Sequence, residues 1–330
     1  MSHSAKSLTG NDIYFNNKIE EEFMSTFKIK HFASKMLFVL LGISFVFLSV
    51  KAISQTGTEL VYKSNEGDIL KYQSIRQTTR TSEREGEPFE FNTTRKYDFQ
   101  LEAEQSDSLL SFVLTINDLD ISSEGRRGGR FQSFDPENIK GKRIQIKISP
   151  KGEHRGLAAI DEIPMPERRG GREGDRRGEG RGNPLEQLRV NFFILPDRPL
   201  KVGDSWTEQY KDLASPGSFF GRFVQNQKVE GKTNYTVLGE EKKNGLSCLH
   251  IKIESTYSRE AEGEMRGNKV TMEGEGETKA EAWFAPKEGI LVELIHDDFF
   301  ESTTAFSGRT MPSSNESKLT LKLLKWQPKQ

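Results

Sequence analysis

Few side chains in this sequence could bind a metal ion, and they occur together at two positions along the chain. Cys248 and His250 would lie on one face of a strand, and His296 opens a His-Asp-Asp run. Zinc takes three or four protein ligands, whereas the sequence after residue 52 offers one cysteine and the three histidines His154, His250 and His296. The run at His296 continues into two phenylalanines, as the end of a hairpin strand would. We therefore interpret both places as ordinary strand positions, and we predict no metal site and no cofactor.

One serine, Ser205, stands in a Gly-Asp-Ser-Trp tetrapeptide that begins at Gly203. The tetrapeptide resembles the signature of a family of serine esterases, in which an Asp-x-x-His near the C-terminus supplies the base. A nucleophilic serine needs such a base to accept its proton, but no Asp-x-x-His occurs in this chain. We interpret the tetrapeptide as a turn before an aromatic strand. The sequence thus predicts no catalytic residue and favours a non-enzymatic protein, with a serine hydrolase that uses Ser205 as the least favoured alternative.

Arginine and glycine dominate two segments that resemble the RGG tracts of nucleic-acid-binding proteins. The longer segment, residues 167–183, mixes four acids with six arginines and has no aromatic residue on which a base could stack. Because it has no apolar side chain to bury, it is predicted to be a disordered, solvated linker that binds no nucleic acid. The alternative is a scaffold role, in which these loops hold an anionic component of the envelope. The arginines available for that partner are Arg126, Arg127, Arg168, Arg169, Arg172, Arg176, Arg177 and Arg181.

An N-terminal leader segment precedes the part of the chain that is expected to fold. Residues 37–50 form an apolar run, with lysines at positions 28, 30 and 35 before it and the small-x-small step Val50-Lys51-Ala52 after it. This order is that of a secretory signal peptide. The run has 14 residues, fewer than the roughly 20 that a spanning helix needs, and an uncleaved anchor is the alternative. Three glutamates before Met24 would disturb the basic flank, which favours Met24 as the true start.

Export fixes the compartment and removes several classes of function. The only cysteine is Cys248, so no intrachain disulfide can form, and no cysteine ends the apolar run to carry a lipid. A large exported chain without disulfides fits a bacterial envelope. Without the leader the net charge is about −3, which predicts no general attraction to nucleic acid. We expect a protein of the periplasm or cell envelope of a Gram-negative bacterium, in contact with a membrane only through export or an uncleaved leader.

The rest of the chain alternates between apolar and polar residues, which is typical of strands with one wet face. Residues 97–103, 143–148 and 318–323 each show this period of two. Asn244-Gly245 is a strong hairpin signal. One short helix is expected to begin at Asn183-Pro184. The sequence therefore predicts an all-β fold, mostly antiparallel, with one short helix and a preceding signal-peptide helix.

Short motifs recur about 136 residues apart and indicate an internal duplication. Gly67-Asp68 recurs at Gly203-Asp204, and Pro150-Lys151 recurs at Pro286-Lys287. Chance recurrence of common turn pairs is the alternative. On this basis we predict two related, curved β-sheet modules. Residues 1–52 are the leader, 53–164 the first module, 165–183 the disordered linker and 184–330 the second module.

A longer stretch carries a family resemblance. Residues 193–206 contain a Leu-Pro followed by Val-Gly-Asp-Ser-Trp, and Trp-Phe-Ala-Pro-Lys-Glu-Gly follows at residues 283–289. This pattern resembles a family of uncharacterised exported bacterial proteins, common in Bacteroidetes-type envelopes, in which Leu-Pro and then Val-Gly-Asp-x-Trp recur midway along the chain. The resemblance covers most of the region after the leader and does not include the Arg/Gly segments. It implies an exported β-rich protein with no catalytic residues to transfer.

These observations favour a non-enzymatic envelope protein that offers a concave apolar face to a lipid-like or peptide ligand. Burial of the ligand's apolar surface, at roughly 25 cal/mol per Å², would hold it in place. Aromatic strand residues would form the wall, and the alternative for each of them is a place in the core. The candidates are Tyr97, Phe99, Trp206, Tyr235 and Trp283.

Overall fold

A computed structural model describes residues 57–84, 87–106, 108–125, 136–163, 185, 188, 190, 192–212, 224–265 and 267–329. These residues belong to one compact unit that begins at Thr56. The leader with Met24, the predicted linker and all eight candidate arginines lie outside the described residues. Within the described ranges, no helix has both the length and the apolar character needed to cross a membrane.

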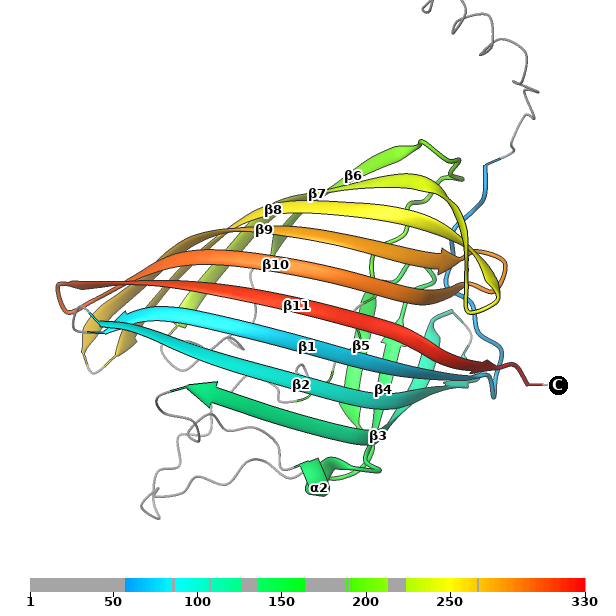
Figure 1. The fold of residues 1–330 in the computed structure, drawn as a ribbon, viewed down its shortest axis with the longest axis horizontal. Coiled ribbons are helices and arrows are strands. Elements are labelled where there is room, and N and C mark those ends of the chain that lie inside the picture. Colours follow the sequence, from blue (N-terminus) through cyan, green and yellow to red (C-terminus); the bar gives the residue numbers. More distant parts are fainter. Residues whose placement is uncertain are drawn as a thin grey trace, which may run out of the picture. The chain divides into compact units, whose positions relative to one another are not determined.

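Eleven strands and one short helix make up the regular structure of the described chain (Figure 1). In chain order they are β1 (Ile69–Arg84), β2 (Glu87–Glu104), β3 (Leu110–Gly125), α2 (Pro136–Ile139), β4 (Arg143–Ile148), β5 (His154–Ala159), β6 (Ser205–Asp212), β7 (Val224–Lys243), β8 (Leu246–Met265), β9 (Asn268–Ala285), β10 (Ile290–Phe306) and β11 (Arg309–Gln327).

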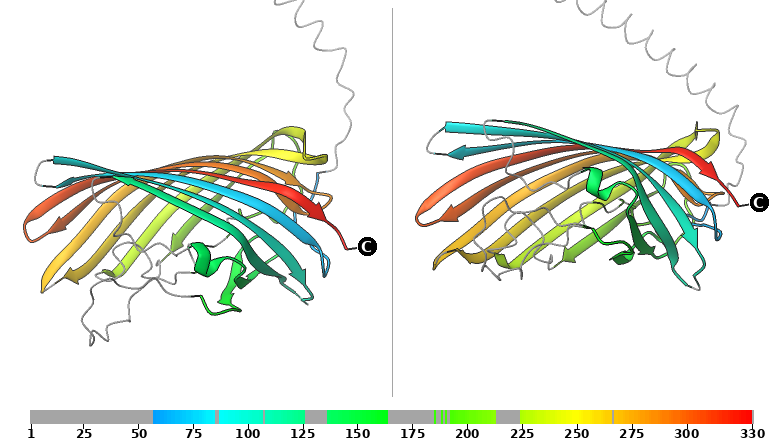
Figure 2. Two further views of the ribbon diagram at one scale, coloured as in Figure 1. Left: turned by 60° about the horizontal axis from the view of Figure 1, so that its bottom comes forward. Right: turned by 90° about the horizontal axis from the view of Figure 1, so that it is seen from below.

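All the strands join one antiparallel sheet, in the order β5-β4-β3-β2-β1-β11-β10-β9-β8-β7-β6. The first and last strands therefore pair with each other in the interior of the sheet, and β5 and β6 form its edges. The sheet is strongly curved, and α2 lies on its hollow side (Figure 2). This confirms the prediction of an all-β, mostly antiparallel fold with one short helix. The helix described is α2, whereas the start of the helix predicted at Asn183-Pro184 lies outside the described residues. Strands from both predicted modules share the sheet, and the module boundaries stay a prediction.

Tight turns join the long strands on the β7-to-β11 side of the sheet. Asn244 and Gly245, between β7 and β8, have φ angles of 50° and 78°. Ser307 and Gly308 repeat the pattern between β10 and β11, with φ angles of 49° and 74°. Two consecutive positive φ angles characterise the turn whose twist matches that of the flanking strands. The hairpin predicted at Asn244-Gly245 is therefore confirmed.

The core fills one end of the concave face, which we define as the face that carries Tyr72, Phe99 and Leu323. These three residues lie side by side on β1, β2 and β11 and are buried, together with Ile139 of α2. Apolar side chains from residues 57–63 and 185–200 complete the same cluster. The opposite face, which we call the convex face, carries the alternate residues of each strand. The sheet thus has one end that is covered by its own chain and a second end that continues beyond the core.

The two Gly-Asp motifs form the same turn. The N–H of Gly67 donates to the carbonyl of Ala103, and the N–H of Ala103 donates to that of Asp68. In the second half, Gly203 and Asp204 make the equivalent pair of bonds with Val237. Both glycines adopt a positive φ, of 84° and 90°. These repeated bonds are consistent with the internal duplication, which remains a prediction of the sequence.

Candidate functional site

Four of the five aromatic candidates lie on the concave face and belong to the core. Trp206 stacks on Tyr235 with ring centroids 4.5 Å apart, and Tyr97 stacks on Phe99 at 4.6 Å. None of the four is more than 9% exposed. The hydroxyl of Tyr97 donates to the backbone carbonyl of Leu188 at 3.4 Å, so the chain at Leu188 packs directly on the Tyr97 ring. The structure brings these residues together within the core cluster, where the protein itself covers them.

Trp283 is also buried, but it lies on the convex face. Its ring stacks on His250 at 4.4 Å, and its indole N–H donates to the carboxylate of Glu241 at 2.9 Å. The ammonium group of Lys243 lies 3.9 Å from the centre of the same ring. The hydrogen bond from Trp283 is the main cause of the lowered pKa of Glu241. Desolvation opposes it, and the charge and hydrogen bond of His250 lower the pKa further. Trp283 is thus enclosed by polar neighbours of its own face.

The positions that could have bound a metal ion are ordinary strand positions. Cys248 is buried, and burial raises the pKa of its thiol to about 11, which keeps it protonated at neutral pH. The ring of His250 lies between the carboxylates of Glu241 and Glu281, with each nitrogen 2.9 Å from an oxygen. Among the described residues, no group of three His, Cys, Asp or Glu side chains is arranged to hold a metal ion.

Ser205 lies at the start of the edge strand β6, where the contacts are those of a turn. Its backbone carbonyl accepts a hydrogen bond from the guanidinium of Arg198 at 2.8 Å. The carboxylate of Asp204 accepts one from the backbone N–H of Lys201 at 3.0 Å. This bond, more than the ion pair with Arg198, holds the pKa of Asp204 below its usual range. The acidic residue beside the serine therefore stabilises the turn.

A pocket of about 420 Å³ lies on the concave face beyond the core, and the sequence reasoning did not find it. Residues from β1, β8, β9, β10 and β11 line it. Arg76 and Thr78 follow Tyr72 along β1 at every second position, so they share its face. Across the sheet, Thr78 lies opposite Ser317, and Ser317 lies opposite Asp298. The volume is within the range that small-molecule sites occupy, about 300–1,000 Å³.

Arginines dominate the charge of this part of the concave face. Arg76 and Arg80 of β1 and Arg259 of β8 line the pocket, and Arg95 of β2 lies directly opposite Arg76. Desolvation by the surrounding walls lowers the pKa of Arg76, and the charge of Asp298 opposes that effect. Desolvation also lowers the pKa of Arg95, and the neighbouring charge of Arg76 lowers it further. Arg76 and Arg95 nevertheless remain charged, because a guanidinium loses its proton only at very high pH.

Two aromatic rings form the floor of the pocket, and glycines make room for them. Tyr257 and Phe300 are stacked, with centroids 5.8 Å apart and ring planes 4° from parallel. A Cβ at Gly276 would lie 2.3 Å from the ring of Tyr257, and one at Gly274 would lie 2.5 Å from that of Phe300. The guanidinium of Arg259 lies 5.1 Å from the centre of the Phe300 ring. The rings can therefore lie flat against the backbone of β9 and present their faces to the pocket.

Asp298 is the acidic residue among those that line the pocket, and neutral groups hold its carboxylate. The hydroxyl of Tyr257 donates to it at 3.1 Å, and that of Thr278 at 2.8 Å. His296 lines the same pocket one pleat closer to the core. Desolvation lowers its pKa; the charge of Asp298 opposes this effect, and that of Arg76 adds to it. The pocket thus combines an excess of positive charge with an aromatic surface.

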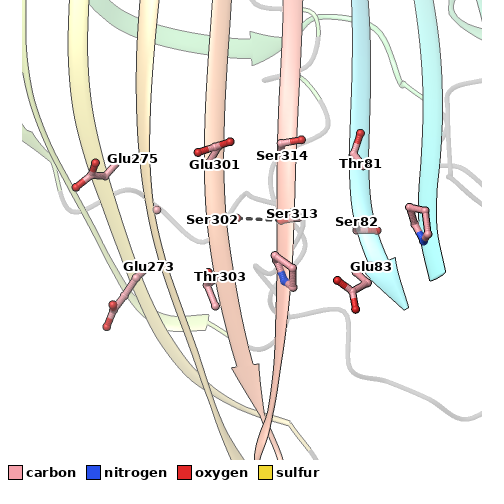
Figure 3. A pocket seen from close by; sticks show the side chains of 13 residues that line it. Thr81, Ser82, Glu83, Glu273, Glu275, Glu301, Ser302, Thr303, Ser313 and Ser314 are labelled. Atoms are coloured by element: carbon pink, nitrogen blue, oxygen red, sulfur yellow. Dashed lines mark hydrogen bonds between the residues drawn. The ribbon is translucent and has the colours of Figure 1, made fainter. Parts of the chain in front are cut away.

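The convex face bears the opposite charge. A hollow of about 680 Å³ lies at the far end of β1, β9, β10 and β11. Glu83, Glu273, Glu275 and Glu301 line it (Figure 3). Ser302 and Ser313, whose hydroxyl groups lie 3.0 Å apart across β10 and β11, border both this hollow and the concave pocket. Among the described residues that line this hollow none is aromatic or basic. It offers neither a charge partner for an anion nor a flat apolar wall, so the concave pocket is the better candidate site.

No protein-family model matches the chain, and no curated protein matches it. Among solved structures, it is similar to lipovitellin in a structure that concerns lipid–protein interactions, with 10% identity over 81% of this chain and 26% of that chain and a TM-score of 0.45. This chain thus spans about a quarter of the lipovitellin chain. It is also similar to OccK2 of Pseudomonas aeruginosa, with 7% identity over 78% of this chain and 98% of that chain and a TM-score of 0.23. A loop-deletion mutant of OmpT, an outer membrane protein of Vibrio cholerae, has 8% identity over 78% of this chain and 99% of that chain, with a TM-score of 0.22. At these values the likenesses carry no conclusion about what this chain does.

Proposed function

We propose that this chain is an exported, non-enzymatic protein of the cell envelope that holds a lipid-like ligand in its concave pocket. The observation that carries the proposal is the pocket of about 420 Å³ on the same face as the core but beyond it. A curved sheet that was only a scaffold would fill this space with its own side chains, as it does around Phe99. The leader supports export.

The lining favours an amphipathic ligand over a purely polar one. The stacked rings of Tyr257 and Phe300 offer a flat apolar contact, and aromatic side chains bury large areas on contact. Serine and threonine hydroxyls from β1, β10 and β11 lie around them and can bond a polar group of the ligand. A peptide ligand is the alternative, because an extended backbone could use the same hydroxyl groups.

Filling the pocket should weaken binding of the ligand. We expect the variant Thr78→Trp to bind N-phenyl-1-naphthylamine, an uncharged apolar fluorophore, at least about tenfold more weakly than the parent chain, which corresponds to about 1.4 kcal/mol. Thr78 lines the pocket, and tryptophan is tolerated in strands, so the bulky ring should occupy the ligand's space without breaking the sheet. A fluorescence titration measures the affinity and the stoichiometry, which we expect to be one fluorophore per chain.

The matched control is Gln77→Trp. Gln77 is the next residue of β1, is exposed and lies on the convex face, so the same side chain is added one position away on the other side of the sheet. The proposal requires Gln77→Trp to bind like the parent chain. Equal binding by both variants, or no saturable binding by the parent chain, would contradict it.

A further inference from the structure

The positive charges inside the pocket destabilise the protein when no ligand is bound. Arg76 and Arg95 lie directly opposite each other on β1 and β2, and like charges in that position destabilise a sheet. Both side chains share the concave face with Arg80 and, across the pocket, with Arg259. Residues that destabilise the empty fold in this way are typical of a site that a ligand completes.

Asp298 is the acidic residue among the described side chains that line the pocket. The carboxylate of Asp298 accepts hydrogen bonds from Tyr257 and Thr278 and acts on Arg76 through its charge alone. The glutamates of β8 and β9 lie on the convex face, where lysines bond to some of them, as Lys252 does to Glu254 at 2.8 Å. The backbone of the sheet therefore separates Arg76 and Arg259 from the glutamates of β8 and β9.

The guanidinium groups are positioned to meet a ligand. Arg76 remains exposed although the walls of the pocket surround it, so its donors face the space that a ligand would occupy. The buried Nε of Arg259 has no hydrogen-bond acceptor among the described residues. Phosphate and carboxylate groups match the planar fork of donors that a guanidinium presents.

We propose that the pocket selects an anionic amphiphile, a lipid whose phosphate or carboxylate head accepts hydrogen bonds from Arg76, Arg80 and Arg259. The apolar part of this lipid lies against Tyr257 and Phe300, which border the same arginines. This inference rests on the proposed function and adds the charge of the ligand to it. It explains why arginines stand at positions 76 and 80 of β1, on the concave face.

Two probes that differ in charge alone test the inference. cis-Parinaric acid is a fluorescent fatty acid, and its methyl ester has the same chain without the negative charge. We expect the parent chain to bind the acid at least about tenfold more tightly than the ester. The double variant Arg76→Gln/Arg80→Gln should lose about that preference, because it weakens binding of the acid much more than binding of the ester. The double variant Arg76→Lys/Arg80→Lys, which keeps the charge, should retain part of the preference.

The control with the same change in net charge is Lys318→Gln/Lys322→Gln. Both lysines lie on the convex face of β11 and are exposed, so this variant should keep the full preference for the acid. Equal binding of acid and ester by the parent chain would overturn the inference and leave the proposed function in place. Binding of neither probe would overturn both. Displacement of the acid by inorganic phosphate at constant ionic strength would identify a site for free anions and would also overturn the inference.

Discussion

Replacing Phe99 by alanine is expected to lower the free energy of unfolding by about 3–5 kcal/mol, the usual range for losing a buried phenylalanine. Phe99 is 1% exposed and is among the largest fully buried side chains of the described chain. Its ring stacks on both Tyr72 and Tyr97, with centroids 5.6 and 4.6 Å away. Because rigid strands carry all three residues, the cavity cannot close when the ring is removed, and the full effect should appear in a urea denaturation curve.

The matched control for Phe99→Ala is Gln100→Ala. Gln100 is the next residue of β2 and lies on the convex face, where it is partly exposed. Its replacement should change the stability by no more than about 0.5 kcal/mol. If Phe99→Ala were as mild as Gln100→Ala, the concave end that we describe as core would instead be open to solvent, and the division of the sheet into a covered and an open end would be wrong.

Replacing Gly152 by alanine is expected to destabilise the protein by more than about 2 kcal/mol. Gly152 has a φ of 93°, which side chains rarely adopt, and it lies in the turn between β4 and β5. An added Cβ would lie 2.5 Å from the carbonyl oxygen of Phe193 and 2.7 Å from the ring of Tyr62. The hydroxyl of Tyr62 donates to that same carbonyl at 3.2 Å, so the methyl group would push apart the loop segments that cover the core.

The variant Gly203→Ala separates the backbone strain of a positive φ from the steric clash of the added methyl group. Gly203 has a similar φ of 90°, but nothing lies within 4 Å of the position that its Cβ would take. It should therefore show the backbone strain alone, about 1–2 kcal/mol. Thermal unfolding of the two variants side by side measures the difference. Equal losses would mean that residues 192–195 do not pack on the turn as the structure shows.

The strands could be predicted from the sequence because their signal is local. Alternation around Phe99 places each side chain on one of two faces without any knowledge of the partner strand. The Asn244-Gly245 turn also acts locally, since its two positive φ angles set the twist of the hairpin. The pairing of β1 with β11 is different, because it joins the two ends of the described chain. No local pattern specifies that contact, so the single sheet could not be predicted.

The candidate site could not be predicted because it depends on the curvature of the sheet. Arg76, Thr78 and Arg80 are polar residues at alternate positions, and a sequence pattern alone assigns such residues to a face in water. The sequence signal that could have revealed them is their even spacing from the buried Tyr72, which places them on the same face of the strand. Trp283 illustrates the converse. It stands next to Phe284, so the two rings point to opposite faces. Both rings are buried, but Trp283 lies on the convex face, where His250 and Glu241 contact it.

The central claim is that the concave pocket holds a lipid-like ligand in the cell. Native mass spectrometry of the protein recovered from the envelope of the cells that make it tests this claim most directly, because it reads the mass of whatever stays bound. We predict one molecule of lipid size on each chain of the parent protein and of Gln77→Trp, and none on Thr78→Trp. The same bound mass on all three proteins, or no bound mass on any of them, would contradict the account.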